Sequence, residues 1–295
     1  MPKFGRPDHA AINADLARAG AGRRPLVAVH RGTFGGTIVE NTAAAVAAAV
    51  RRGGDLIEID LVASTDGDVF CFHTDYEPYH FASPTGGEVM PNLATLSTAE
   101  IETLRYHWID PEQPVERLET VLRTQPTTLL NLDRAWDHWE HVLPVIARDP
   151  RPGRFLLKSP VLDERLDLLE RSEVAFPYMG MVRTPAEVES LLSRDNLNLV
   201  AVEVIASDPD DPFCDPEVIA SLKGEGLLVW ANSLNLADGK RRYAGLDDVT
   251  SVLSDPHLGW GAMIDRGIDI IQTDWPDLLS SYLRERGVAA GGRLA

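Results

Sequence analysis

The chain has 295 residues, of which 44% are hydrophobic and 25% are charged, and its formal net charge is −17. This apolar fraction is too high for a disordered chain, and no run approaches the roughly 18–20 uninterrupted apolar residues of a membrane helix. The surplus of carboxylates argues against a nucleic-acid binder, because cations are lacking to neutralise a polyphosphate backbone.

The N-terminal segment 1–20 is polar and lacks the continuous apolar stretch of a signal peptide. We expect it to form a polar helix ahead of the first strand, and we expect a cytoplasmic protein. The two cysteines, Cys71 and Cys214, are far apart and form no CxxC pair. This spacing favours two reduced, buried thiols over a disulfide or a zinc site.

Strand-like segments alternate with segments of helical periodicity along most of the chain. A helix is expected over 41–52, another over 185–194, and a third over 215–223, where Asp215 caps and Pro216 begins the helix. Strands that alternate with helices pair in parallel through right-handed crossovers, so eight such units predict a (β/α)₈ TIM barrel, an α/β fold. The eight strand segments are 25–32, 55–64, 127–134, 154–160, 176–183, 197–207, 226–234 and 268–276.

Two segments depart from a bare barrel, and the last residues are expected to form a tail. Residues from about 75 to 114 are rich in Gly, Pro and aromatic residues and are predicted to form a small inserted subdomain after the second strand. The stretch 233–258 is long for a connection between a strand and a helix, and 287–295 is expected to be a loose tail. We therefore expect one TIM-barrel domain over 1–295, with its long loops at the face where barrels carry active sites.

Two carboxylates, Glu58 and Asp60, interrupt the apolar second strand in the sequence LIEIDL. Side chains alternate along a strand, so both lie on one face, either in the barrel interior or against the helices. Burial against the helices would cost several kcal/mol without a partner. A position at the mouth of the barrel, holding a divalent cation, avoids that cost. The alternative is a pair of structural carboxylates balanced by cations elsewhere.

Other strands also end in polar or aromatic side chains. This distribution is what a catalytic barrel with an open mouth requires. The residues are His30 and Arg31 on the first strand, His73 after the extended run VFCF, Asn131 and Asp133 on the third, Lys158 on the fourth, Glu203 on the sixth, Trp230 and Asn232 on the seventh, and Asp274 and Trp275 on the eighth.

The residue types indicate the chemistry. Carboxylate and amide oxygens suit Mg²⁺ or Ca²⁺ better than zinc, and such a cation neutralises a phosphoryl or carboxyl oxygen. Two histidines, His30 and His73, are suited to act as a general acid and a general base near neutral pH. The guanidinium of Arg31 fits a phosphate. Trp230 and Trp275 either wall the substrate pocket or only pack.

These motifs resemble the glycerophosphodiester phosphodiesterase family over roughly residues 25–280. The resemblance implies a TIM barrel with an insertion, a role in lipid metabolism, and hydrolysis of a phosphodiester to a phosphomonoester and an alcohol, through a cyclic phosphate. The motifs that carry it are HRG (30–32), ENT (40–42), GGDLIEIDL (53–61) with a following DG turn and His73, PVERLETVL (114–122), VWAN (229–232) and GIDIIQTDWP (267–276).

The resemblance also assigns roles to residues. It implies that His30 and His73 are the acid–base pair, that Glu58 and Asp60 are metal ligands, and that Arg31 contacts phosphate.

The chain departs from the family pattern at the third strand. The family's Glu-x-Lys is replaced by Asn131-Leu-Asp133, so the acid moves by two residues and the lysine is absent. We expect Asp133, together with Asn131, to complete the metal site, and Lys158 to supply the missing cation for phosphate. Glu203 is expected either to contact substrate or to balance Lys158. These changes leave a sugar or lysolipid phosphodiester open as the substrate.

Two other functions remain open at the level of sequence. A lyase similar to phospholipase-D-type toxins would release a cyclic phosphate and stop there. A non-catalytic module would hold a phosphorylated ligand at the barrel mouth, although a matched acid and base argue against it. The sequence does not distinguish Mg²⁺ from Ca²⁺ and leaves the oligomeric state unknown.

Overall fold

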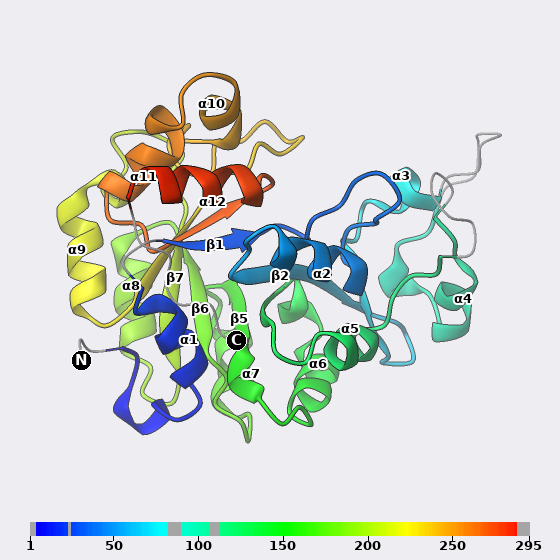
Figure 1. Ribbon diagram of the computed structural model, residues 1–295. Coiled ribbons are helices and arrows are strands. Elements are labelled where there is room, and N and C mark those ends of the chain that lie inside the picture. Colours follow the sequence, from blue (N-terminus) through cyan, green and yellow to red (C-terminus); the bar gives the residue numbers. More distant parts are fainter. Residues whose placement is uncertain (1–3, 23–24, 82–89, 107–112, 288–295) are drawn as a thin grey trace.

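Eight parallel strands close into a barrel in the computed structural model, which describes residues 4–22, 25–81, 90–106 and 113–287 (Figure 1). Their order around the barrel is β1-β9-β8-β7-β6-β5-β4-β2, and pairing of β1 with β2 closes the ring. The predicted TIM barrel is thereby confirmed. The strands are β1 (Leu26–Val29), β2 (Leu56–Ala63), β4 (Leu129–Asp133), β5 (Phe155–Pro160), β6 (Tyr178–Val182), β7 (Leu199–Val204), β8 (Leu228–Asn232) and β9 (Ile270–Thr273).

Helices follow the barrel strands and cover their outer face. The helix predicted at Asp215 begins as expected, since the Asp215 side chain accepts a hydrogen bond from the backbone N–H of Glu217 and Pro216 is the first helical residue. These helices are α2 (Ala43–Arg51), α5 (Leu118–Thr124), α6 (Trp139–Ile146), α7 (Asp163–Glu170), α8 (Pro185–Leu192), α9 (Pro216–Gly224), α10 (Asp248–Leu253), α11 (Ala262–Asp265) and α12 (Pro276–Glu285).

The barrel has two apolar layers, one between the strands and the surrounding helices and one inside the ring of strands. Outward-facing strand residues such as Ile57 and Leu132 pack against helix residues such as Val46. Inward-facing residues near the start of the strands form a second cluster, which Leu16 of α1 (Ala14–Gly20) joins from outside the ring. This interior cluster closes the amino-terminal end of the barrel, so the polar interior positions lie toward the carboxyl-terminal end.

The segment after the second barrel strand forms an insertion that packs on the end of β2. The short strand β3 (Val69–Cys71) runs antiparallel to β2, and α3 (Glu77–Phe81) and α4 (Thr98–Thr103) follow it. Figure 1 shows α3 and α4 projecting to one side, far from α9. The apolar cluster of the insertion includes Phe70, Phe81, Leu93 and Ile101 and is shared with Val62 of β2. The predicted insertion is thus confirmed where the chain is described.

Parts of two predicted segments lie outside the described residues: 82–89 and 107–112 of the insertion, and 288–295 of the tail. Cys71 and Cys214 are both buried and free, as expected. None of the helices in the described ranges combines the length and apolar character that would carry it across a membrane.

Candidate active site

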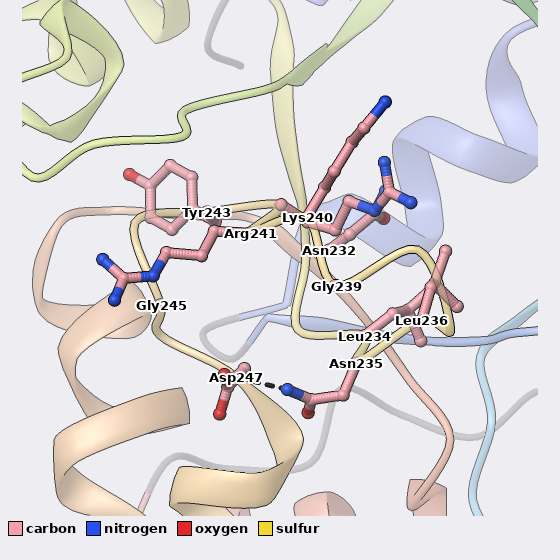
Figure 2. Close-up of a pocket in the computed structure, with 11 residues that line it drawn as sticks. Asn232, Leu234, Asn235, Leu236, Gly239, Lys240, Arg241, Tyr243, Gly245 and Asp247 are labelled. Carbon is pink, nitrogen blue, oxygen red and sulfur yellow. Dashed lines mark hydrogen bonds between the residues drawn. The ribbon is translucent and has the colours of Figure 1, made fainter.

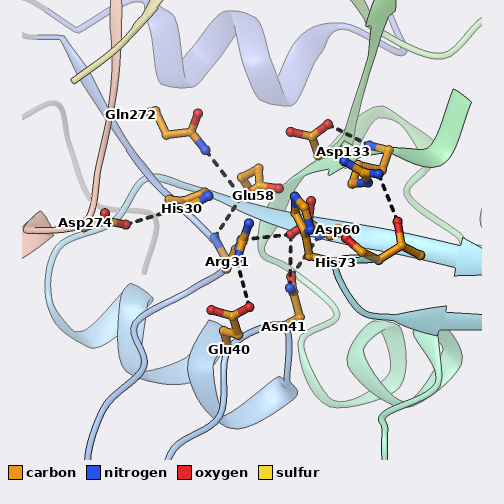
Figure 3. Close-up of polar contacts among 12 residues, drawn as sticks. His30, Arg31, Glu40, Asn41, Glu58, Asp60, His73, Asp133, Gln272 and Asp274 are labelled. Atoms are coloured by element: carbon orange, nitrogen blue, oxygen red, sulfur yellow. Dashed lines mark hydrogen bonds and ion pairs between the residues drawn. The ribbon is translucent and has the colours of Figure 1, made fainter. Parts of the chain in front are cut away.

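Three carboxylates meet inside the barrel at the carboxyl ends of β2 and β4. Glu58 pairs in register with Asn131, and Asp60 pairs with Asp133, so the polar positions of the two strands lie side by side. Oxygens of Glu58, Asp60 and Asp133 lie within 4.8 Å of one another. The interior position is the one that strand alternation and the cost of burial favour (Figure 3).

Glu58 is completely buried and only partly satisfied. Its Oε2 accepts a 2.8 Å hydrogen bond from the Arg31 backbone N–H and a weak 3.4 Å one from the Gln272 amide. Its Oε1 has no hydrogen-bond partner among the described residues. Burial, together with repulsion from Asp60 and Asp133, raises the pKa of Glu58 to about 8. In the absence of a balancing cation, this carboxyl would keep its proton at neutral pH.

The donor set therefore fits a hard divalent cation. Asn131 donates its amide N–H to the carbonyl of Leu156 at 2.8 Å, while its buried Oδ1 has no partner in the described part of the chain. Glu58 and Asn131 thus each hold a buried oxygen with free lone pairs, next to two further carboxylates. Oxygens of this kind are the ligands that Mg²⁺ and Ca²⁺ prefer, and a divalent charge would relieve the repulsion among the acids.

Asn41 fixes the orientation of Asp60. The backbone N–H of Asp60 donates to Asn41 Oδ1 at 2.9 Å, and Asn41 Nδ2 donates to Asp60 Oδ2 at 3.1 Å. The next residue, Thr42, caps helix α2, and its side chain accepts a hydrogen bond from the Ala45 N–H. This double hydrogen bond leaves the second oxygen of Asp60 to face the other carboxylates.

Arg31 is buried among carboxylates. Its Nη1 donates to Glu40 at 2.9 Å, its Nε lies 3.1 Å from Asp60 Oδ2, and its guanidinium stacks on the Tyr76 ring. Nearby acids, above all Asp60, outweigh burial and raise the pKa of Arg31. In the structure the guanidinium of Arg31 is paired with the carboxylates of Glu40 and Asp60. The contact between Arg31 and a phosphate therefore stays a prediction.

Both predicted histidines are held through Nδ1. His30 donates from Nδ1 to Asp274 at 2.9 Å, and His73 donates from Nδ1 to the carbonyl oxygen of Thr74 at 2.6 Å. Each ring therefore keeps Nε2 for a proton transfer.

The two rings differ in acidity. Burial alone would lower the pKa of His30, but the bond with Asp274 and the charge of Glu58 raise it overall. Burial lowers the pKa of His73, and the nearby charge of Asp60 offsets this only in part. The two histidines border the carboxylate group beside Glu58 and Asp60, respectively.

Lys158 bridges two acids deep in the mouth. Its Nζ lies 2.5 Å from Asp133 and 3.2 Å from Glu203. These ion pairs lower the pKa of Asp133 despite its burial and raise that of Lys158. Glu203 also accepts from Asn232 at 2.9 Å. Of the two roles expected for Glu203, balancing Lys158 is the one that these contacts support.

The two tryptophans lie in different environments. Trp230 is completely buried and belongs to the interior apolar cluster, which favours the packing role over contact with substrate. Its indole N–H holds Asn232 Oδ1 at 2.7 Å. Trp275 is 47% exposed and follows Asp274 directly, so it remains a candidate for contact with substrate.

Backbone strain concentrates in the loops around this site. Arg31, Asn41, Asp75 and Arg134 all have φ between 53° and 79°, a left-handed conformation that is costly for residues other than glycine. Arg31 follows His30, and Arg134 follows Asp133. Gly32 also has a positive φ of 71°, and a Cβ there would lie 2.7 Å from the Ala45 backbone. The glycine of the HRG motif thus lets the loop pack onto α2.

Some functional contacts were not expected from the sequence. Asp274 was placed at the end of the last strand without a role, although it holds His30. The parts that Asn41 and Gln272 play beside the acids were also missed. A polar residue within an otherwise apolar strand was the available signal for Gln272, as it was for Glu58.

Sequence comparison matches residues 30–146 to the Glycerophosphoryl diester phosphodiesterase family and residues 178–283 to a domain of unknown function. No curated protein matches the chain.

The fold is similar to that of several solved structures. A glycerophosphoryl diester phosphodiesterase from Parabacteroides distasonis is 18% identical, with a TM-score of 0.67, over 97% of this chain and 94% of that one. A phosphodiesterase from Oleispira antarctica, in complex with the product sn-glycerol-3-phosphate, is 20% identical, with a TM-score of 0.61, over 88% and 97%. The glycerophosphodiester phosphodiesterase of Thermotoga maritima is 18% identical, with a TM-score of 0.61, over 88% and 98%.

Proposed function

We propose that the chain is a phosphoric diester hydrolase acting on glycerophosphodiesters. Residues 30–146 match the Glycerophosphoryl diester phosphodiesterase family, which supports this proposal. The observation that carries the proposal is the group of three interior carboxylates with an unsatisfied Glu58 oxygen, bordered by two histidines that are both held at Nδ1. The Oleispira antarctica phosphodiesterase with sn-glycerol-3-phosphate supports a small phosphodiester as substrate.

A divalent cation, Mg²⁺ or Ca²⁺, is part of this proposal. Glu58, Asp60 and Asp133 would hold it, with Asn131 Oδ1 as a further ligand. When bound, the cation supplies positive charge for a phosphate oxygen of the substrate. Arg31, Lys158 and Trp275 are proposed to contact the substrate as well.

The two histidines divide the proton transfers. His73, whose pKa is lowered, is neutral and accepts at Nε2 the proton of the substrate's attacking glycerol hydroxyl. His30, whose pKa is raised, donates its Nε2 proton to the departing alkoxide. The new P–O bond gives a cyclic phosphate, and the broken one releases the alcohol.

Hydrolysis of the cyclic phosphate uses the same two nitrogens in reverse. His30 Nε2 accepts a proton from the attacking water, and His73 Nε2 returns a proton to the glycerol oxygen as the ring opens. The product is a phosphomonoester, and both rings regain their starting protonation states.

A phosphodiester panel followed by phosphorus NMR tests the function. We expect glycerophosphodiesters to yield glycerol phosphate, with activity lost on chelation and restored by Mg²⁺ or Ca²⁺. His30→Ala and His73→Ala are each expected to lose about 10²-fold or more in kcat. His141→Ala, at a half-exposed histidine on α6, is the matched control.

Each contrary outcome removes a stated part of the proposal. Activity that withstands chelation removes the cation. Near-full activity in both histidine variants removes the acid–base pair. A cyclic phosphate that persists identifies the lyase instead, and tight binding of a diester without turnover identifies a binding module.

A further inference from the structure

The loop between β8 and α10 places three consecutive cations beside the barrel mouth. The residues are Lys240, Arg241 and Arg242, and they form a local group of positive charge in a chain whose net charge is −17. With Asn232 at the end of β8, they line a cavity of about 230 Å³ (Figure 2). Neither the family match nor the predicted chemistry assigns this cavity a role.

The loop is anchored to the barrel rather than loose. The Asp248 N–H donates to the Ser233 carbonyl at 2.7 Å and so closes the loop at its base. The Tyr243 hydroxyl donates to the Phe213 carbonyl at 2.8 Å, and backbone hydrogen bonds join Arg242 and Ala244 to Ala206. A fixed backbone around the cations favours a preformed pocket.

Two acids near the cavity, Asp238 and Asp247, already have partners, and Asp238 balances the charge of Arg242. Asp238 forms an ion pair with Arg242 at 2.7 Å. The hydrogen bond from the Lys240 backbone N–H lowers the pKa of Asp238, and the positive charges of Arg242 and Lys240 contribute to this shift. Asp247 accepts from the Asn235 amide and caps α10 through the Thr250 N–H. Within the described residues, the side chains of Lys240 and Arg241 make no hydrogen bond or ion pair, and both residues are exposed.

Asn232 lines the cavity and is linked to the catalytic residues by hydrogen bonds and ion pairs. Asn232 donates to Glu203 at 2.9 Å, Glu203 accepts from Lys158, and Lys158 contacts Asp133 at 2.5 Å. An alcohol group that leaves the phosphodiester on the side of Asn232 would extend toward the cationic loop.

The size of the cavity limits its occupant. Pockets that enclose a whole small molecule measure roughly 300–1,000 Å³, so a cavity of about 230 Å³ fits one group of a larger ligand. Figure 2 shows Lys240 and Arg241 leaving the loop in different directions. The positive charges of the cavity are thus distributed over separate side chains, rather than concentrated in a single guanidinium that would bind a ligand through two hydrogen bonds.

We propose that this cavity binds a phosphate monoester on the alcohol part of the substrate, so that the enzyme prefers glycerophosphodiesters whose alcohol carries a second phosphate. The inference rests on the proposed function and names its substrate class. The overall negative charge repels polyanions at long range, while the local cations attract a doubly charged phosphate monoester.

Paired substrates test the inference. We would compare glycerol 3-phosphate diesters of ethanediol, propanediol and butanediol, each with a terminal hydroxyl or a terminal phosphate. We expect the terminal phosphate to raise kcat/KM by at least about tenfold for one chain length, through KM. The double variant Lys240→Gln/Arg241→Gln should lose this preference and keep its kcat on the hydroxyl-ended diesters.

The matched control is Arg51→Gln/Arg52→Gln, which removes the same charge from two exposed arginines at the far end of α2 and should keep the preference. Equal kcat/KM for both substrate forms at every length, or a preference that survives in the Lys240/Arg241 variant, overturns the inference. If inorganic phosphate alters turnover of the hydroxyl-ended diesters only when Lys240 and Arg241 are present, the cavity is a free-phosphate site and the inference is also wrong.

Failure to cleave any diester refutes the proposed function instead.

Discussion

Replacing Asp274 by Asn tests how the two histidines divide the acid and base roles. Asp274 accepts the 2.9 Å hydrogen bond from His30 Nδ1, and this bond contributes to the raised pKa of His30. Asn keeps the size of the side chain and removes the charge. If His30 is the general acid, its pKa defines the alkaline limb of the pH profile of kcat/KM, and that limb should move to lower pH.

The geometry sets the size of the shift. A hydrogen bond to a charged group contributes about 1.5–3 kcal/mol. The His30 side chain is only 12% exposed, but that of Asp274 is 32% exposed, so water weakens the pair and the lower end of the range applies. About 1.5 kcal/mol corresponds to a fall of roughly one unit in the pKa of His30.

The assay measures kcat/KM between pH 5 and 10 on one glycerophosphodiester at a fixed, saturating divalent cation, for the wild type, Asp274→Asn and the control Asp277→Asn. Asp277 is exposed in the first turn of α12 and has the same charge. We expect the alkaline limb to move by about one unit in Asp274→Asn alone. Movement of the acidic limb instead would make His30 the base, and two unmoved limbs would refute the assignment of Asp274.

Three further predictions concern binding and stability. Glu58→Gln removes a carboxyl whose burial and repulsion by neighbouring acids raise its pKa to about 8. We therefore expect a thermal midpoint in chelator at or above that of the wild type, and no further rise on adding Mg²⁺ or Ca²⁺. A rise equal to that of the wild type would count against the cation site. Asn41→Ala removes both hydrogen bonds to Asp60. It should lower the free energy of unfolding in urea by about 1–3 kcal/mol and weaken cation binding in calorimetry. Unchanged cation affinity would show that Asn41 does not orient Asp60 for the cation. Burial raises the pKa of Asp248 to about 6, so the folded state binds more protons than the unfolded state between about pH 4 and 6. The free energy of unfolding should therefore fall by about 3 kcal/mol as the pH rises through that window. Urea unfolding of wild type and Asp248→Asn across this range checks this, since the variant should lose that part of the slope and an unchanged slope would contradict it.

The barrel was predictable because its signals are local. Each strand is a short apolar run such as LVAV (Leu26–Val29), and each helix start carries its own cap, as at Asp215. The insertion was recognisable from composition for the same reason. The short strand β3 was expected only as an extended run, because its antiparallel pairing with β2 depends on a tight turn that brings Val69 beside Ala63.

The carboxylates were predictable in position but not in their partners. Alternation along β2 places Glu58 and Asp60 on one face, and the cost of burial favours the interior. The sequence could not indicate that Arg31 is engaged by Glu40 and Asp60, because that contact depends on the folded path of the loop between β1 and α2. Nor did it indicate the full burial of Trp230, which follows from the inward side of β8.

By itself, the sequence determined the architecture, the residues that enter the barrel interior, and the chemistry that those residue types support. Periodicity and residue type are properties of short segments and need no knowledge of distant neighbours. Only the tertiary structure decided which groups touch: His30 meets Asp274 across 244 residues of chain because β1 pairs with β9, and Lys158 meets Asp133 and Glu203 across the barrel mouth. Those contacts depend on barrel closure and strand register. The contact of His30 with Asp274 also contributes to the difference in acidity between the two histidines, on which the proposed mechanism depends.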